Sequence, residues 1–217
     1  MTTSRLAAIS SLLAVGAVCF ATTSGATVAA ERGPVPVCLG EPVTIFWGPE
    51  ASATEGDDVI LGTDGDDVIR GEAGRDKICS GDGADRVDGS RDADEVDAGD
   101  GGDAVWGGGG DDVIDGGPGD DALDGGGDND LLTGGDGADR IVGGRHADLV
   151  FGGPGPDDLL GGRSKDRVLG GYGDDTLLGS QGDDRLAGGP GHDQCFGEEG
   201  HDVARTCEER HSAADGS

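Results

Sequence analysis

One apolar position recurs every nine residues along most of the chain. From Ala53 to Arg205 the sequence divides into seventeen consecutive nine-residue units without insertion or deletion. The eighth residues of these units are Ile60, Ile69, Ile78, Val87, Val96, Val105, Ile114, Leu123, Leu132, Ile141, Val150, Leu159, Val168, Leu177, Leu186, Cys195 and Ala204. We expect a three-residue strand centred on each of them, with its side chain pointing inward and the array tapering at the last two units.

The other half of each unit predicts a turn. A well-formed unit, residues 116–124, reads GGPGDDALD. Glycine and aspartate supply the backbone conformations with positive φ that tight turns need. Because strand and turn alternate, successive units lie on opposite sides of a coil, and two units close one turn. The strands would then stack about 4.8 Å apart in two parallel sheets, over about eight and a half turns and about 40 Å. The sequence therefore predicts an all-β fold.

Aspartate occupies the sixth position of every unit. These residues are Asp58, Asp67, Asp76, Asp85, Asp94, Asp103, Asp112, Asp121, Asp130, Asp139, Asp148, Asp157, Asp166, Asp175, Asp184, Asp193 and Asp202. Loops two units apart lie one above the other on the same edge of the coil, so each pair of stacked loops encloses a pocket. Carboxylates and loop carbonyls are hard oxygen donors, which favour Ca²⁺ over thiophilic metals and over the more demanding Mg²⁺.

Composition and charge strengthen the case for bound cations. The chain has 217 residues with 47 glycines, 45 acidic residues and a formal net charge of −30. Such a chain would by default be disordered. One inward side chain per nine residues gives a thin core, which must offset both backbone ordering and charge repulsion. We therefore expect the metal-free coil to be unfavourable and multivalent cations to supply the difference.

The repeated GGxGxDxUx pattern resembles the haemolysin-type calcium-binding repeat family, also called RTX. The resemblance covers residues 53–205, and it implies a parallel β-roll, a right-handed β-helix-like solenoid, with calcium between successive turns. It also implies that the sixth-position aspartates are side-chain ligands and that neighbouring loop carbonyls complete the coordination. Each of the two edges has one slot fewer than it has loops, so seventeen loops leave fifteen slots. At most about fifteen Ca²⁺ ions are therefore expected.

The two edges of the coil differ in sequence. The fourth position is glycine in every even-numbered unit, whereas four odd-numbered units have Asp92, Asp128, His146 and Ser164 there. The odd loops also contain Arg75, Arg91, Arg145, Arg163 and Lys165. We expect the even-edge slots to fill first, and the middle of the odd edge to be partly vacant with basic side chains replacing ions.

The segments outside the repeats predict secretion and capping. Residues 1–30 contain Arg5, an apolar stretch over 6–21 and a small residue at Ala30, features typical of a secretory signal peptide cleaved after that residue. The stretch has too few clearly apolar residues for a membrane span. We expect an extracellular protein with an N-terminal cap at residues 31–52, including a strand within 43–47. The roll follows at 53–205, with a C-terminal cap and flexible tail at 206–217.

Four cysteines remain after removal of that signal peptide. They are Cys38, Cys79, Cys195 and Cys207. An even number of cysteines in an oxidising compartment favours disulfides. Pairing Cys38 with Cys79 and Cys195 with Cys207 would tie each terminal segment to an end of the array, and free thiols are the alternative.

The sequence gives less support to an enzyme, a nucleic-acid-binding protein or an adhesive protein. The histidines His146, His192, His201 and His211 have no serine, cysteine or lysine placed to form a catalytic set with them, so we expect no enzyme. The acidic charge repels nucleic acid. Outward ninth positions are apolar in five successive units, at Val142, Phe151, Leu160, Leu169 and Leu178, which indicates either self-association or a surface partner, or simply strand propensity. The sequence favours a secreted protein that folds on binding calcium, and the alternative is an adhesive or matrix protein.

Overall fold

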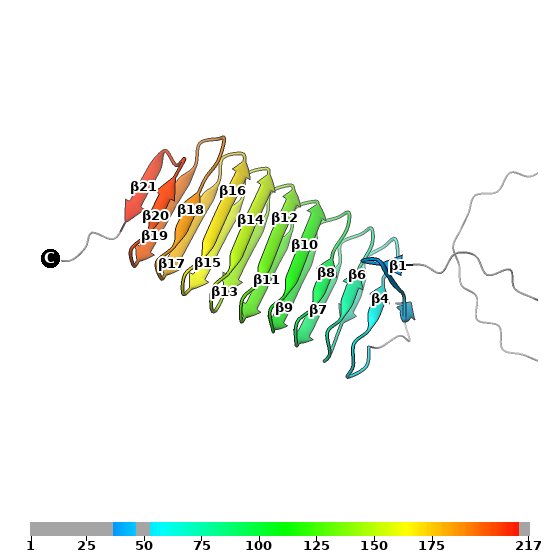
Figure 1. The fold of residues 1–217 in the computed structure, drawn as a ribbon. Helices are drawn as coiled ribbons and strands as arrows, with labels where there is room; N and C mark the ends of the chain where they lie inside the picture. The colour runs from blue at the N-terminus through cyan, green and yellow to red at the C-terminus, as the bar shows by residue number, and fades with distance from the viewer. Residues whose placement is uncertain (1–36, 47–52, 213–217) are drawn as a thin grey trace, which may run out of the picture. The chain divides into compact units, whose positions relative to one another are not determined.

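Twenty-one short strands and no helix make up residues 37–46 and 53–212, the part of the chain that the computed structural model describes (Figure 1). The backbone alone is described at residues 46 and 209–212. The expected signal peptide, residues 1–30, lies outside this part. All the described residues belong to one compact unit, and all contacts below lie within it.

Nineteen of these strands form two parallel sheets. The ten-stranded sheet contains β3 (Ile45–Phe46), β4 (Val59–Leu61), β6 (Lys77–Cys79), β8 (Glu95–Asp97), β10 (Val113–Pro118), β12 (Leu131–Asp136), β14 (Leu149–Pro154), β16 (Arg167–Tyr172), β18 (Arg185–Ala187) and β20 (Val203–Arg205). The nine-stranded sheet contains β5 (Val68–Arg70), β7 (Arg86–Arg91), β9 (Ala104–Gly109), β11 (Ala122–Gly127), β13 (Arg140–Gly144), β15 (Asp158–Arg163), β17 (Thr176–Gln181), β19 (Gln194–Glu199) and β21 (Glu209–Ser212). Within the repeats each strand pairs in parallel with the strand two units further on, as Ile114 does with Leu132. The predicted all-β fold with two parallel sheets is confirmed.

Many strands are longer than the predicted three residues. Strand β9, for example, has six residues and continues through the first three positions of the following unit. Those glycine positions are paired between turns, as Gly117 is with Gly135. A Cβ atom at Gly117 would collide with the carbonyl oxygen of Gly99 in the turn before. Glycine therefore serves the close approach of successive turns as well as the turn conformation.

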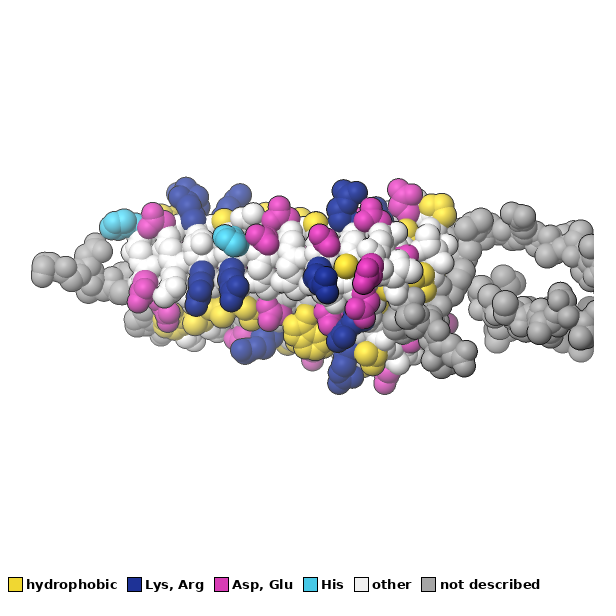
Figure 2. All heavy atoms as spheres, turned by 90° about the horizontal axis from the view of Figure 1, so that it is seen from below, with side chains coloured by type: hydrophobic (Ala, Val, Ile, Leu, Met, Phe, Trp, Pro, Cys, Tyr) yellow, Lys and Arg dark blue, Asp and Glu magenta, His cyan; other side chains and the backbone are white. Residues whose placement is uncertain are grey.

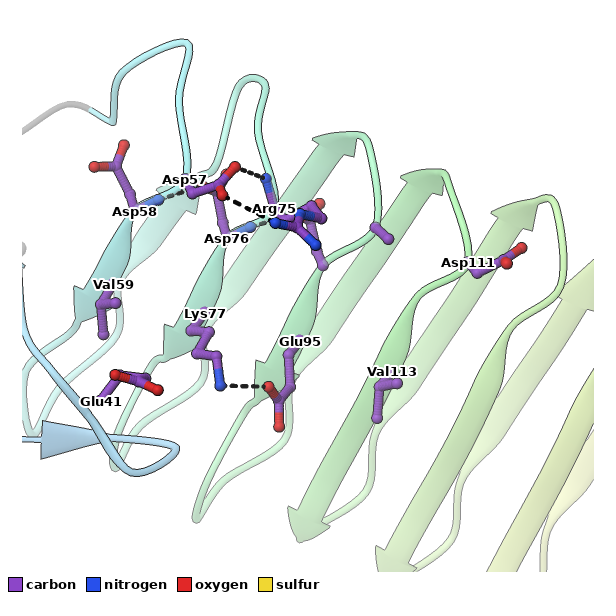
Figure 3. A pocket seen from close by; sticks show the side chains of 12 residues that line it. Glu41, Asp57, Asp58, Val59, Arg75, Asp76, Lys77, Glu95, Asp111 and Val113 are labelled. Carbon is purple, nitrogen blue, oxygen red and sulfur yellow. Dashed lines mark hydrogen bonds and ion pairs between the residues drawn. The ribbon is translucent and has the colours of Figure 1, made fainter.

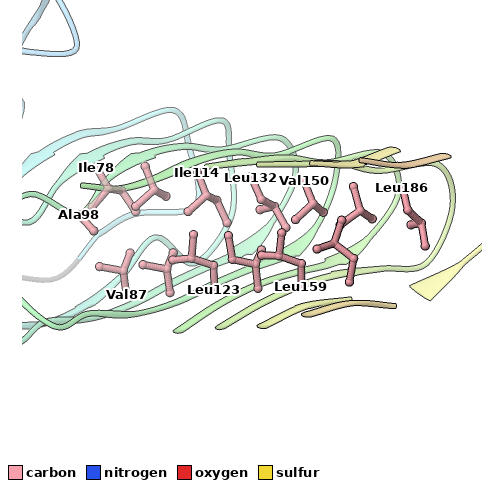
Figure 4. Close-up of a cluster of buried hydrophobic side chains, with 14 of the residues drawn as sticks. Ile78, Val87, Ala98, Ile114, Leu123, Leu132, Val150, Leu159 and Leu186 are labelled. Carbon is pink, nitrogen blue, oxygen red and sulfur yellow. The ribbon is translucent and has the colours of Figure 1, made fainter. Parts of the chain in front are cut away.

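The core is a double row of eighth-position side chains between the two sheets (Figure 4). From Ile60 to Cys195, none of these side chains is more than 2% exposed. Ala204 packs against the end of the row and is only partly buried, as the expected taper requires. The predicted inward positions are confirmed.

Extra strands and disulfides close both ends of the roll. Strand β3, within the predicted segment 43–47, extends the ten-stranded sheet beyond β4, and β1 (Val37–Cys38) and β2 (Glu41–Pro42) form an antiparallel hairpin. Disulfide bonds join Cys38 to Cys79 and Cys195 to Cys207, the pairs that the sequence favoured.

A further strand lies within the segment 206–217, which the sequence predicted as C-terminal cap and flexible tail. Strand β21 pairs in parallel with β19. The Cys195–Cys207 bond returns the chain to the end of the nine-stranded sheet. There the last strand of the repeats offers unpaired backbone groups to an added strand.

Candidate metal centre

The loops between the strands form two stacks, one along each edge of the roll (Figure 1). Loops of odd-numbered units lead into the ten-stranded sheet, and loops of even-numbered units lead into the nine-stranded sheet. Equivalent residues in neighbouring loops of one stack are 18 residues apart. The predicted ligands therefore form two columns of carboxylates.

One oxygen of each stacked carboxylate is held by the loop before it. The backbone N–H of Asp94 donates to Oδ1 of Asp112 at 2.8 Å on the odd edge, and the N–H of Asp103 donates to Oδ1 of Asp121 at 2.8 Å on the even edge. The same bond recurs at each step from Asp58–Asp76 to Asp184–Asp202. This ladder fixes the orientation of every carboxylate.

The other oxygen, Oδ2, is buried and has no hydrogen-bond partner in fifteen of the seventeen aspartates. These are Asp76, Asp85, Asp94, Asp103, Asp112, Asp121, Asp130, Asp139, Asp148, Asp157, Asp166, Asp175, Asp184, Asp193 and Asp202. Buried polar atoms without partners are rare, and an unpaired buried charge is strongly unfavourable. A carboxylate oxygen accepts only, so a proton or a cation must satisfy each of these atoms. Their number equals the predicted maximum of slots.

The first aspartate on each edge is capped by a threonine. Oδ2 of Asp58 accepts from both the backbone N–H and the hydroxyl of Thr54, each at 2.8 Å. Thr63 does the same for Asp67, at 2.7 and 2.9 Å. This role of Thr54 and Thr63 was not predicted, although threonine occupies the second position only in the first two units.

Glu208 completes the last turn of the even edge. Its carboxylate accepts from the N–H of Asp193 at 2.5 Å. It thereby replaces the aspartate that the next loop would have provided. The role of Glu208 was not predicted either, because this residue lies outside the repeat frame.

In thirteen of the fifteen units with an open oxygen, this oxygen faces a glycine at the first position of its own unit, whereas Ser80 and Ala98 occupy that position in the units of Asp85 and Asp103. A Cβ atom at Gly89 would lie 2.5 Å from Oδ2 of Asp94 and 2.8 Å from the carbonyl oxygen of Gly107. A carboxylate oxygen and a backbone carbonyl oxygen thus converge where glycine leaves space. Among the described residues, no three His, Cys, Asp or Glu side chains form a metal cluster. A cation held here would need backbone carbonyls in its coordination shell, as hard cations accept.

Comparison with known families agrees with this arrangement. The model of the RTX calcium-binding nonapeptide repeat (4 copies) matches residues 52–87, 80–114, 88–123, 97–132, 124–159 and 169–204. The chain belongs to this family. A search of curated proteins finds no match. The predicted resemblance is confirmed, and the roll is a calcium-binding RTX repeat structure.

Burial makes the charged form of the RTX carboxylates unfavourable in the absence of metal. It raises the pKa of Asp94 and Asp130 to about 8, with repulsion from neighbouring aspartates adding to the effect. The same causes raise the pKa of Asp121, Asp157 and Asp166 to about 7. The hydrogen bond to each Oδ1 acts in the opposite direction but does not prevail. A bound divalent cation would reverse this balance by stabilising the ionised form.

The two edges of the RTX roll differ in backbone geometry only where the odd edge lacks glycine, since its glycines Gly74, Gly110, Gly182 and Gly200 have φ between 111° and 142°. On the even edge, the fourth-position glycines from Gly83 to Gly191 have φ between 132° and 159°. The four non-glycine residues of the odd edge, Asp92, Asp128, His146 and Ser164, have φ between 67° and 82°. Unequal calcium occupancy of the two edges stays a prediction.

Hydrogen bonding at the fourth position also differs between the edges. On the even edge the N–H of Gly83 donates to the carbonyl of Asp100 at 2.8 Å. On the odd edge side chains accept at two of these positions, since Gly74 donates to Oδ2 of Asp92 and Asp128 donates to Nδ1 of His146, whereas Gly182 donates to the carbonyl of Glu199 as on the even edge.

Basic side chains do not replace cations in the odd-edge slots. Arg75 forms an exposed ion pair with Asp57 at 3.3 Å, whereas Arg145, Arg163 and Lys165 are exposed. In the surface view, Lys and Arg side chains stand out beside the pale loop backbone (Figure 2). None of them bonds an Oδ2 atom of the described aspartate column, so this expectation was wrong. The open oxygens lie behind the loop backbone, where a side chain of the loop surface does not reach.

The apolar ninth positions lie where the repeat frame placed them. Val142, Leu160 and Leu178 are in register on the nine-stranded sheet. Phe151 and Leu169 are in register on the ten-stranded sheet. All five are half-buried by their neighbours on the outer surface.

Replacing a single sixth-position aspartate tests its predicted role. Asp121→Asn keeps Oδ1 as the acceptor for Asp103 but removes the charge at the open oxygen. Because affinity for Ca²⁺ depends on the number of charged ligands, we expect the loss of one or two bound ions and about 10-fold weaker binding next to this loop. The matched control is Asp120→Asn, since Asp120 is exposed and accepts only from Ala138 at 2.9 Å. Calorimetric titration with calcium measures both. Equal effects of the two variants would contradict the assignment.

Proposed function

We propose that this chain is a secreted calcium-binding protein whose RTX repeats fold when Ca²⁺ binds between successive turns. The observation that carries the proposal is the set of fifteen buried Oδ2 atoms without a partner. They occur once per loop from the third unit onward, and only there. A hard divalent cation suits such oxygen donors.

We propose the sixth-position aspartates from Asp76 to Asp202 as side-chain ligands, with carbonyls of the glycine loops as the remaining protein donors. Asp58 and Asp67 close the first loops instead, since threonine satisfies their Oδ2 atoms. Fifteen Ca²⁺ ions would carry a charge of +30, which balances the formal charge of −30. Neutralisation would remove most of the repulsion along the roll.

The disulfide bonds and the expected calcium affinity support an extracellular location. Two disulfide bonds are typical of proteins outside the cytosol, and the expected signal peptide at residues 1–30 supports export. No helix in the described part of the chain is long and apolar enough to cross a membrane. Extracellular calcium modules bind with Kd values of about 10⁻⁴ to 10⁻³ M. Folding would therefore begin where calcium is plentiful, after export.

A binding role fits the site better than catalysis does. The loops repeat the same arrangement, whereas catalysis requires one distinguished set of groups. The alternative of an adhesive or matrix protein is favoured by exposed apolar residues on the sheet surfaces, among them Val113 and Leu131.

Equilibrium dialysis with counting of bound ions tests the proposal. The mature chain in millimolar calcium is expected to bind close to fifteen ions, and excess Mg²⁺ is expected to displace few of them because it demands tighter octahedral geometry. Binding of only one or two ions, or equal binding of Mg²⁺, would refute the proposed sites.

A further inference from the structure

The outer surface of the ten-stranded sheet is divided into three zones along the roll. We call this surface, formed by the seventh and ninth positions of the odd-numbered units, the ten-strand face. Its N-terminal half contains Glu95, Asp97 and Asp115. Its middle contains Val113, Leu131, Leu149 and Phe151. Its C-terminal end contains Arg167, Arg185 and Arg205, and no acidic residue occupies its positions in the last five odd-numbered units.

The basic end of the ten-strand face is a groove of about 400 Å³. Arg167 is in register with Arg185, and Ala187 is in register with Arg205. All three arginines are exposed, and none forms an ion pair within the described residues. Adjacent cations without an acidic partner repel one another. In a chain with 45 acidic residues, this arrangement leaves the groove ready for an anionic partner.

The acidic end of the same face is overhung by the N-terminal hairpin. Cys38 of the hairpin is bonded to Cys79, with 5.8 Å between their Cα atoms, so the hairpin lies directly on the sheet. Glu41 of the hairpin is exposed and lines a pocket of about 500 Å³ together with Val59, Lys77 and Glu95 (Figure 3). Lys77 is already paired with Glu95 at 3.0 Å. Because Lys77 is taken up by Glu95, the carboxylates of Glu41, Asp97 and Asp115 at this end form no ion pair within the described residues.

We propose that the ten-strand face binds a second copy of this chain, with the two rolls running in opposite directions. The face contains the nine odd-numbered units, and the ninth unit, which contains Leu131, is at its centre. A two-fold axis at Leu131 therefore places the first unit of one copy opposite the seventeenth unit of the other, and the remaining units follow in the same way. Glu95 then lies opposite Arg167, and Val113 lies opposite Leu149. The hairpin above the first and third units lies opposite the groove of the fifteenth and seventeenth units. Glu41 of one copy then lies between Lys77 of the same copy and Arg185 of the other copy.

The shape of the face agrees with this pairing. Packed sheets lie about 10 Å apart, and the Cα atom of Cys38 in the hairpin is 5.8 Å from that of Cys79 in the sheet, so the hairpin fits between two packed faces only opposite small side chains. Ala187 is the residue opposite Cys79, and it forms part of the groove. Of the seven exposed large apolar residues in the described part of the chain, Val113, Leu131 and Val203 lie on this face and Val37 lies on the hairpin beside it.

The size of the face is sufficient for a stable dimer. Nine strands about 4.8 Å apart span about 40 Å, and a width of about 15 to 20 Å gives on the order of 700 Å² on each copy. A standard interface buries about 800 Å² on each partner. Charge complementarity at both ends would select the antiparallel arrangement, because a parallel one places the basic grooves against each other.

Charge exchange across the proposed interface provides the sharpest test. In calcium, sedimentation equilibrium of the mature chain is expected to give twice the mass of one chain. R167E and E95R, each alone, place like charges in contact and should weaken the dimer about 100-fold or more. An equimolar mixture of the two variants restores opposite charges at every contact, so it should dimerise like the wild type. Monomers in the mixture, or a wild type that is monomeric at about 100 μM, would overturn the proposal.

A second pair of variants separates the two sheet surfaces. L131E places two carboxylates together at the two-fold axis and is expected to abolish the dimer. V68E makes the same charge change on an exposed residue of the nine-stranded sheet and is expected to leave the dimer intact. Far-UV circular dichroism in calcium verifies that each variant is folded, which keeps this test independent of the metal sites. Loss of the dimer in V68E but not in L131E would assign self-association to the other sheet.

Discussion

Removal of calcium is expected to abolish the β-structure of the mature chain, and about 1 to 10 mM Ca²⁺ is expected to restore it. Without cations, fifteen buried Oδ2 atoms lack a partner, and their charges stack at the spacing of successive turns. Burial of unpaired charge is among the most unfavourable terms in protein energetics. The core offers only one side chain per nine residues to oppose it, so binding and folding should be a single process.

Far-UV circular dichroism during a calcium titration measures this transition. The chelated chain should give a disordered spectrum, with a cooperative change to β-structure as calcium rises. Mg²⁺ at the same concentration is the control and should leave the chain disordered. The proposed coupling would be lost if the exhaustively chelated protein kept the β-sheet spectrum of the calcium form.

Mild acid is expected to promote structure in the metal-free chain rather than to denature it. Burial raises the pKa of Asp94 and Asp130 from 3.8 to about 8 in the folded roll, while the unfolded value stays near 4. A group whose pKa is higher in the folded state favours folding below its unfolded pKa, and this contribution is lost as pH rises through the folded pKa. Between pH 4 and pH 8, the free energy of unfolding of the metal-free roll should therefore be lowest at pH 8 and should increase as the pH falls to about 4.

A structural reason supports the direction of this change. A protonated Oδ2 becomes a hydrogen-bond donor, and a backbone carbonyl converges on the same space, as Gly107 does beside Asp94. Protonation also reduces the net charge along the roll. Protons should compete with calcium, so calcium affinity should fall over the same pH range.

Circular dichroism of the calcium-free chain between pH 8 and pH 4 measures this effect. Addition of calcium at each pH gives the reference for full folding and reports the fall in affinity. A metal-free chain that becomes more disordered as the pH is lowered from 8 to 5 would show that the raised pKa values do not govern its stability.

The repeat frame predicted most of the architecture. The apolar eighth position of the repeat predicted that Ile60 lies in the core, and the same position in a later unit predicted this for Leu186. Both are buried. The same frame placed the carboxylates in columns and showed that the fourth position is always glycine on the even edge but not on the odd edge. The reason is that every unit contacts only its neighbours, so a local period determines the global arrangement.

The ends of the roll could not be predicted in this way, because they lie outside the repeat frame. Thr54 and Thr63 cap the first carboxylates through hydrogen bonds that depend on the path of the first loops. Glu208 reaches Asp193 only because a disulfide returns the chain to the last turn. Strand β21 forms for the same reason.

By itself the sequence determined the family, the fold class, the inward residues and the columns of aspartates, because each depends on a period of nine residues that is visible in one dimension. Only the tertiary structure decided which carboxylate oxygen is open and which is held. It also showed that Arg145 and Lys165 do not enter the loop stacks, and that Arg167 and Glu95 occupy opposite ends of one face. These features depend on contacts between residues 18 or more positions apart, and such contacts exist only once the turns are stacked.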